Sequence, residues 1–203
     1  MQSIEVCGEQ ISPSKIVCVG RNYVAHVKEL GNEIPDEMVV FIKPNSALSN
    51  TLHAQHEEQL HYEGEIAFVI NDSVIAAVGF GLDLTKRGLQ SRLKVKGLPW
   101  ERAKAFDGAA LFSDFVTLPE NIDELTMELK VDGEIRQAGG VGLMMYKPSV
   151  ILDELNKFTT LEDGDIIMTG TPAGVGEVIA GENFEGRIIA GSETLVSASW
   201  IAQ

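Results

Sequence analysis

Two glutamates with one residue between them, Glu63 and Glu65, lie in a stretch whose aromatic and branched residues predict a β-strand over residues 60–70. Side chains along a strand alternate between its faces, so both carboxylates point the same way. Adjacent carboxylates on an apolar strand repel each other and lose hydration, which a divalent cation between them would relieve. Hard cations such as Mg²⁺ take oxygen ligands. The alternative is an edge strand whose polar face meets water.

A second pair of residues could move protons. His26 and Glu29 are three residues apart in a segment, residues 22–30, whose apolar spacing predicts a helix, so their side chains share one surface. A carboxylate beside an imidazole favours the charged ring and can fix its tautomer, which is the arrangement of a general base. The alternative is an exposed helix face on which Lys28 and Glu29 meet water.

Lys104 and the segment 169–176 each allow two interpretations. Lys104 lies among small and aromatic residues, so it is either a buried ammonium with an anionic partner or a lysine whose stem packs while its head stays in water. Three glycines, a proline and two threonines let the backbone of residues 169–176 approach a ligand such as a carboxylate. The same composition also suits a tight structural turn.

Many short strands must position these side chains. Apolar runs separated by turn residues predict strands along most of the chain, including one over residues 74–82 that ends directly before Asp83. Helical spacing is clear only at residues 22–30, 85–93 and 148–158. The pattern predicts a mainly β (α+β) structure with a few peripheral helices.

Composition excludes several classes of function. The formal net charge of −14 over 203 residues argues against a nucleic-acid partner or an anionic membrane, and it requires any acid-binding pocket to be locally positive. No apolar run approaches the roughly 20 residues that span a bilayer. The two cysteines, Cys7 and Cys18, have no metal-binding spacing and fit a reducing, cytoplasmic setting.

Several short motifs occur in one order between about residues 15 and 176. They are residues 19–23 with His26 and Glu29, 41–44, 62–65, 82–85 with Arg87 and Gln90, 103–106, 132–134 with Arg136 and Gln137, 164–167, and 169–176. Each motif alone is weak, but the ordered set resembles the fumarylacetoacetate hydrolase family. Two stretches depart from the family's pattern and bear on substrate identity and dimer contacts: the short segment between Glu65 and Asp83, and the glycine-rich run 138–144.

The resemblance implies a fold and a set of roles. It implies a mixed β-sandwich roll of the family's C-terminal type, as one catalytic domain over residues 1–203 with a short N-terminal strand segment at residues 1–14, and a homodimer that uses Mg²⁺ or Mn²⁺. Carried over position by position, the roles are metal ligands for Glu63, Glu65 and Asp83, an acid–base dyad for His26 and Glu29, a catalytic lysine beside the metal for Lys104, and substrate binding for Arg21, Gln90 and Thr171.

The family's chemistry leads to the functional expectation. Its members act on 2-oxo and 1,3-diketo acids through a metal-bound enolate, so we expect a hydrolase of the C–C bond of acylpyruvates such as fumarylpyruvate or acetylpyruvate. The alternatives are an oxaloacetate tautomerase or decarboxylase and a 2-hydroxyhepta-2,4-diene-1,7-dioate isomerase. A more remote alternative is a non-catalytic protein that binds a metal or an acid. The presence of His26, Glu29 and Lys104 favours an enzyme.

Overall fold

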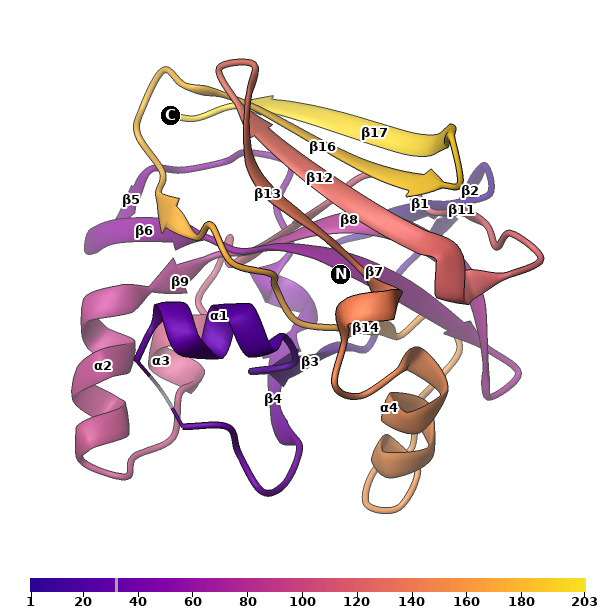
Figure 1. Cartoon of the computed structure of the whole chain (residues 1–203), viewed down its shortest axis with the longest axis horizontal. Coiled ribbons are helices and arrows are strands. Elements are labelled where there is room, and N and C mark those ends of the chain that lie inside the picture. The colour runs from indigo at the N-terminus through magenta and orange to yellow at the C-terminus, as the bar shows by residue number, and fades with distance from the viewer. Residues whose placement is uncertain (32) are drawn as a thin grey trace.

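The fold is described by a computed structural model that covers residues 1–31 and 33–203. Its central element is a mixed sheet of seven strands, and a second sheet of four strands packs on one side of it (Figure 1). The seven-stranded sheet has the order β10 (Ala110–Phe112), β8 (Val74–Asp83), β7 (Gly64–Asn71), β14 (Ile166–Met168), β3 (Lys15–Gly20) and β4 (Val39–Pro44), with β11 (Val116–Thr117) also paired to β8. The predicted mainly β fold is confirmed.

The other strands form smaller sheets. The four-stranded sheet has the order β13 (Glu134–Gly140), β12 (Leu125–Val131), β16 (Asn183–Ala190) and β17 (Glu193–Ile201). A further sheet joins β15 (Gly176–Glu177), β6 (Glu58–Tyr62), β5 (Gln55–His56) and β9 (Thr85–Lys86), and β1 (Ile4–Val6) pairs with β2 (Glu9–Ile11).

Short helices connect the strands. The α-helices are α1 (Val24–Glu29), α2 (Arg87–Val95), α3 (Glu101–Lys104) and α4 (Pro148–Leu155), and single 3₁₀ turns are η1 (Asn45–Ala47), η2 (Ile122–Glu124) and η3 (Val141–Leu143). In Figure 1 the α-helices lie below β7 and β8, on the side away from β12, β16 and β17. Within the described residues, no helix is long and apolar enough to cross a membrane. The helical turn at α3 was not predicted, because four residues are too few to show a helical period.

The core confirms the alternation predicted for the strand over residues 60–70. Ile66 and Phe68 of β7 pack in one hydrophobic cluster with residues of the four-stranded sheet, whereas Ala67 and Val69 pack in a second cluster on the opposite face. A Cβ atom on Gly186 would collide with the ring of Phe80, so glycine at this position lets the two sheets approach each other. The predicted strand is interrupted at one residue, because β6 ends at Tyr62 and β7 begins at Gly64.

Strand direction brings the polar residues to one edge of the seven-stranded sheet. β3 and β14 are parallel, so the segments after both strands leave the sheet at the same edge. β7 is antiparallel to β14 and therefore begins at that edge, and β8 is antiparallel to β7 and therefore ends there. Arg21 after β3, Gly170 after β14, Glu65 near the start of β7 and Asp83 at the end of β8 are thus neighbours in space.

Candidate active site

Three carboxylates meet at this edge. One ligand oxygen from each of Glu63, Glu65 and Asp83 lies within 4.8 Å of the other two. The exposed fractions of these residues are only 6%, 2% and 1%, so the wet edge strand that the sequence allowed does not occur. The backbone contributes directly, because the Asp83 N–H donates to the Glu63 carbonyl at 2.8 Å and fixes the end of β8 beside the start of β7.

Buried cations neutralise two of the three carboxylates. Lys104 Nζ lies 2.8 Å from Glu63 Oε2 and 2.7 Å from Asp83 Oδ2. Arg87 also pairs with Glu63, and Lys43 Nζ lies 2.8 Å from Asp83 Oδ1. Burial opposes ionisation of Glu63, but Lys104 and Arg87 hold the pKa of that carboxyl well below its usual range. Burial also opposes the charge on Lys104, yet Asp83 and Glu63 raise its pKa. Lys104 is therefore a buried ammonium with anionic partners.

Glu65 has a different environment. Its Oε2 accepts a hydrogen bond of 2.7 Å from the Gly170 N–H, and among the described residues no basic side chain lies within ion-pair distance of it. Burial, followed by the charges of Asp83 and Glu63, raises the pKa of Glu65 well above its ordinary value. A metal cation that binds Glu65 must therefore compete with a proton for this carboxyl.

These residues fit a hard divalent cation. Asp83 Oδ1 is buried and accepts no aligned hydrogen bond within the part of the chain that the structure describes, although Lys43 lies beside it. Oε1 of Glu65 likewise has no hydrogen-bond partner among the described residues, since the Gly170 N–H donates to Oε2. Three converging carboxylates with unused lone pairs are a donor set for Mg²⁺ or Mn²⁺ and not for a soft metal.

His26 and Glu29 form a hydrogen-bonded pair beside the carboxylates. His26 Nδ1 lies 3.3 Å from Glu29 Oε2, and Glu29 Oε1 accepts from the Gly174 N–H at 3.0 Å. His26 is only 6% exposed, so the exposed helix face that the sequence allowed holds for Lys28 and Glu29 but not for His26. Burial lowers the pKa of His26, against the opposing effects of Glu63 and Glu29, so the ring is neutral at pH 7. With Nδ1–H donated to Glu29, Nε2 carries the lone pair of a base.

A narrow cavity of about 30 Å³ connects these groups. The three carboxylates, His26 and Lys104 line it, and so do the residues predicted to bind substrate, Arg21, Gln90 and Thr171. Gln90 Oε1 accepts from Arg87 Nη1 at 2.9 Å, and the Thr171 hydroxyl donates to the Gly64 carbonyl at 2.9 Å. Every predicted site residue therefore lies at this cavity except Glu29, which reaches it through His26.

Sequence reasoning gave no role to three residues that build the centre, although all three lie in the motifs described above. Lys43 is fully buried and donates to the carbonyls of Lys104 and Ala109 besides pairing with Asp83. Gln137 Oε1 accepts from the Gly64 N–H at 2.8 Å, and its Nε2 donates to the Thr171 hydroxyl at 2.7 Å. Arg87, the third, pairs with Glu63. A lysine inside an apolar strand was the signal available for Lys43, because such a lysine requires buried anions.

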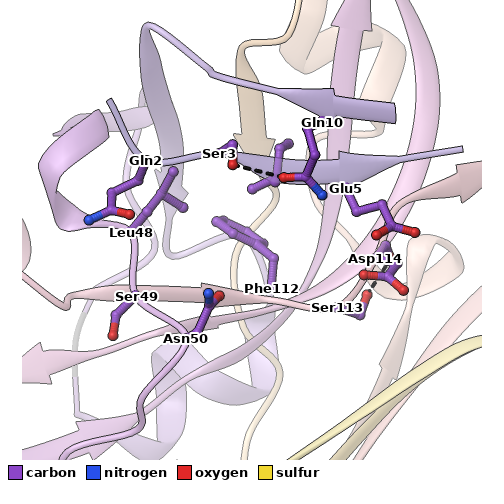
Figure 2. Close-up of a pocket in the computed structure, with 11 residues that line it drawn as sticks. Gln2, Ser3, Glu5, Gln10, Leu48, Ser49, Asn50, Phe112, Ser113 and Asp114 are labelled. Atoms are coloured by element: carbon purple, nitrogen blue, oxygen red, sulfur yellow. Dashed lines mark hydrogen bonds between the residues drawn. The ribbon is translucent and has the colours of Figure 1, made fainter. Parts of the chain in front are cut away.

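A larger cavity lies elsewhere and lacks this chemistry. It has a volume of about 230 Å³, and Figure 2 shows its lining between the N-terminal strands and the segment around Phe112. Its polar groups include the hydrogen bonds from Ser3 Oγ to Gln10 Oε1 and from Ser113 Oγ to the Asp114 carbonyl (Figure 2). The described residues that line it include carboxylates but no lysine, arginine or histidine, so this cavity would repel an organic acid.

Comparison with known proteins identifies the family of this chain. Residues 15–199 match the model of the fumarylacetoacetate hydrolase C-terminal domain. The chain belongs to the fumarylacetoacetate hydrolase family. Its relatives include the oxaloacetate tautomerase YcgM of Escherichia coli K12, 38% identical over 187 residues (83% of this chain and 85% of the relative). The mitochondrial oxaloacetate tautomerase FAHD1 of Arabidopsis thaliana is 41% identical over 197 residues (89% and 88%).

Solved structures place this family member in the same fold. A candidate fumarylacetoacetate isomerase/hydrolase from Oleispira antarctica superposes with a TM-score of 0.92 at 35% identity and covers 100% of both chains. The fumarylpyruvate hydrolase of Pseudomonas aeruginosa, solved with Mn²⁺ and pyruvate, has a TM-score of 0.87 at 30% identity and covers 100% of this chain and 96% of its own. The homodimer and the choice between Mg²⁺ and Mn²⁺ stay predictions.

In this family member, Asp83 supports the fold as well as the site. Replacing Asp83 with alanine leaves Lys43 and Lys104 buried without this counter-charge, so we expect the metal-free protein to lose about 3–5 kcal/mol of unfolding free energy. Urea denaturation in EDTA measures the loss. Asp114→Ala is the matched control, because Asp114 is exposed and its removal should change stability by less than about 0.5 kcal/mol. Equal stability of the two variants would contradict the role of Asp83 as a counter-ion.

Proposed function

We propose that this protein is a tautomerase that interconverts the keto and enol forms of oxaloacetate with the help of a divalent cation. The observation that carries the proposal is that a buried, uncharged histidine lines one cavity together with three carboxylates and a charged lysine. Relatives at 31–41% identity named oxaloacetate tautomerases support the same activity. The sequence had favoured acylpyruvate hydrolysis, with tautomerisation as an alternative; the relatives favour the alternative.

The proposed reaction moves one proton. His26 Nε2 removes a proton from C3 of the keto form while Glu29 holds the Nδ1 hydrogen. The electron pair of the broken C–H bond forms the C2–C3 double bond, and the carbonyl pair moves to the C2 oxygen. The protonated His26 then delivers its proton to that oxygen, which gives the enol and restores the neutral ring. Glu63, Glu65 and Asp83 would hold the cation, which would supply a Lewis acid.

Lys104 contributes as a fixed positive charge. Its ammonium donates to Glu63 Oε2, to Asp83 Oδ2 and, at 2.6 Å, to Thr85 Oγ1, so its three hydrogens are already engaged. A preorganised charge in a buried site stabilises negative charge that develops on a substrate oxygen without further rearrangement. We infer that Lys104 acts in this electrostatic way and not as a proton donor.

The second candidate is hydrolysis of an acylpyruvate, which the structural similarity to the fumarylpyruvate hydrolase of Pseudomonas aeruginosa favours. It would use the same groups but with His26 directed at a water molecule that attacks the distal carbonyl. Decarboxylation of oxaloacetate would also need a stabilised enolate, and isomerisation of a diene-dioate would need a base as well. Tautomerisation needs fewer additional parts than hydrolysis, because it requires no second reactant in a narrow cavity.

One assay separates the two candidates. The enol absorbance of oxaloacetate is followed after mixing with the purified protein and Mg²⁺ or Mn²⁺, then again after EDTA. In parallel, pyruvate release from acetylpyruvate and fumarylpyruvate is measured. We expect EDTA-sensitive acceleration of the enol–keto exchange and little pyruvate release. Rapid pyruvate release from an acylpyruvate without faster exchange of oxaloacetate would assign the protein to the hydrolases instead.

A further inference from the structure

Two basic side chains, Arg21 and Lys94, line the cavity without a counter-charge among the residues that the structure describes. We propose that Lys94, together with Arg21, binds the distal carboxylate of the substrate and thereby makes the site select 2-oxo dicarboxylic acids over 2-oxo monocarboxylic acids. The inference rests on the proposed function, in which the carboxylates of the protein and Lys104 act on the 2-oxo acid end of oxaloacetate. It adds to that function the residues that recognise the opposite end.

The charges at the cavity differ in their pairing. Lys43, Lys104 and Arg87 each lie within ion-pair distance of Glu63 or Asp83. Among the described residues, no carboxylate oxygen lies within 4.0 Å of a basic nitrogen of Arg21 or Lys94, although both side chains are half-buried at the cavity. In a chain with 30 acidic and 16 basic residues, two cations left without a partner inside one cavity indicate an anionic ligand.

Lys94 is held in place by an apolar surface that does not neutralise it. Its Nζ lies 5.1 Å from the centre of the Trp100 ring, which in turn packs 6.0 Å from the ring of Phe41. A cation over an aromatic face keeps its full charge. Burial, followed by the charges of Arg21 and Arg87, lowers the pKa of Lys94 to about 8, whereas Glu63 acts in the opposite direction. Lys94 is therefore positively charged at pH 7 and would be stabilised by an incoming anion.

Arg21 is held in an uncommon backbone conformation at the same cavity. Its φ of 57° lies in the left-handed region, which residues with a Cβ seldom adopt outside turns and functional sites. Its Nε is buried and has no hydrogen-bond partner within the described chain. A buried donor without an acceptor costs free energy, so a carboxylate oxygen at this position would stabilise the protein.

Helix α2 carries residues for both ends of the substrate. Arg87, Gln90 and Lys94 are spaced by three and four residues, so they share one face of the helix. Arg87 pairs with the metal-site residue Glu63, and Lys94 lies two helical turns further along. The cavity of about 30 Å³ has room for only a few water molecules. The long side chains must therefore rotate to admit a four-carbon acid, and a flexible lysine stem can follow its carboxylate.

The test compares a substrate with a distal carboxylate and a ligand without one. Oxaloacetate and pyruvate share the 2-oxo acid end, and only oxaloacetate carries the second carboxylate. Lys94→Gln is expected to raise the Kd of oxaloacetate, measured by calorimetry with Mg²⁺, by about 10–100-fold, the value of one charge-assisted hydrogen bond. The Kd of pyruvate should change less than about twofold. Lys94→Arg should restore oxaloacetate binding, and Lys96→Gln, at an exposed position just beyond the same helix, is the matched control.

Each result decides for or against the proposal. Equal weakening of oxaloacetate and pyruvate by Lys94→Gln, or unchanged oxaloacetate binding, would overturn it. Wild-type protein that binds oxaloacetate at least tenfold more tightly than pyruvate, with the preference lost in Lys94→Gln, would support it. Because the Kd reports binding whether or not the bound acid reacts, the comparison would stand even if the protein failed to accelerate enol–keto exchange, so failure of the proposed function is seen separately.

Discussion

Replacing Glu65 with glutamine is expected to abolish tight binding of divalent cations and, at the same time, to stabilise the metal-free protein. Glu65 is the one carboxylate of the three that has no cationic partner among the described residues, and its pKa is raised by burial and by Asp83 and Glu63. Glutamine keeps an oxygen for the Gly170 N–H and removes the acid. Mutations of residues that only support metal ligands typically weaken metal binding by about 10–100-fold. Because Glu65 would be a direct ligand, its loss should raise the Kd of Mn²⁺ by more than about 100-fold.

The stability gain has a defined dependence on pH. A carboxyl whose pKa is raised in the folded state stays protonated there while it ionises in the unfolded chain, so the folded state loses stability as pH rises above the ordinary pKa of glutamate. The Tm difference between Glu65→Gln and wild type in EDTA should therefore widen from pH 4.5 toward pH 8. Glu120→Gln, at an exposed position, should show no such trend.

Calorimetry in buffers of different ionisation enthalpy measures independently how many protons the protein releases when it binds a metal. Wild-type protein should release a proton from Glu65 when it binds Mn²⁺ at neutral pH. Wild-type affinity for Mn²⁺ in Glu65→Gln would show that this carboxylate is not a ligand. A Tm difference in EDTA that does not change with pH would show that Glu65 is ionised in the folded protein.

Replacing His26 with alanine is expected to lower oxaloacetate tautomerisation by about 10²–10⁴-fold, the range for a positioned general base. The Kd of Mn²⁺ should stay near that of wild type, because His26 is not among the carboxylates that would hold the metal. His53→Ala is the control, since His53 is exposed and does not line the cavity. Normal turnover by His26→Ala would remove the dyad from the mechanism.

The partner of His26 can be tested through the pH profile. The base form of His26 is the neutral ring, so kcat/KM should fall as pH decreases through the lowered pKa of this residue. Glu29 raises that pKa through its hydrogen bond and charge. Glu29→Gln should therefore move the acidic limb of the profile to lower pH, besides reducing the rate. A limb that does not move would mean that Glu29 only supports the loop at Gly174, to which it also binds.

The reaction itself was the least accessible to the sequence. Hydrolysis, tautomerisation and isomerisation all need a base, an enolate stabilised by positive charge and a set of hard oxygen donors, so His26, Lys104 and the three acidic residues are common to all of them. The relatives favour tautomerisation. The two residues proposed to recognise the distal carboxylate differ in this respect: Arg21 lies in a motif that predicted substrate binding, whereas Lys94 has no sequence spacing that marks it as part of a site.

The sequence by itself determined the chemistry available and the local geometry. It placed Glu63 and Glu65 on one side of the chain because successive side chains of a strand alternate, and it placed His26 beside Glu29 because three residues nearly complete a helical turn. These are short-range relations, fixed by backbone dihedral angles within a few residues. The ordered motifs added the family and its fold.

Only the tertiary structure decided which charges meet. Strand directions in the seven-stranded sheet bring Asp83 close to Glu63 and Glu65. Packing of α3 against β4 and β9 then places Lys104 between Glu63 and Asp83. Burial then placed Lys43 against Asp83, raised the pKa of Glu65 and lowered the pKa of His26. Pairing and desolvation depend on atoms that are distant in sequence, so only the folded protein decides how readily these groups take up or release a proton.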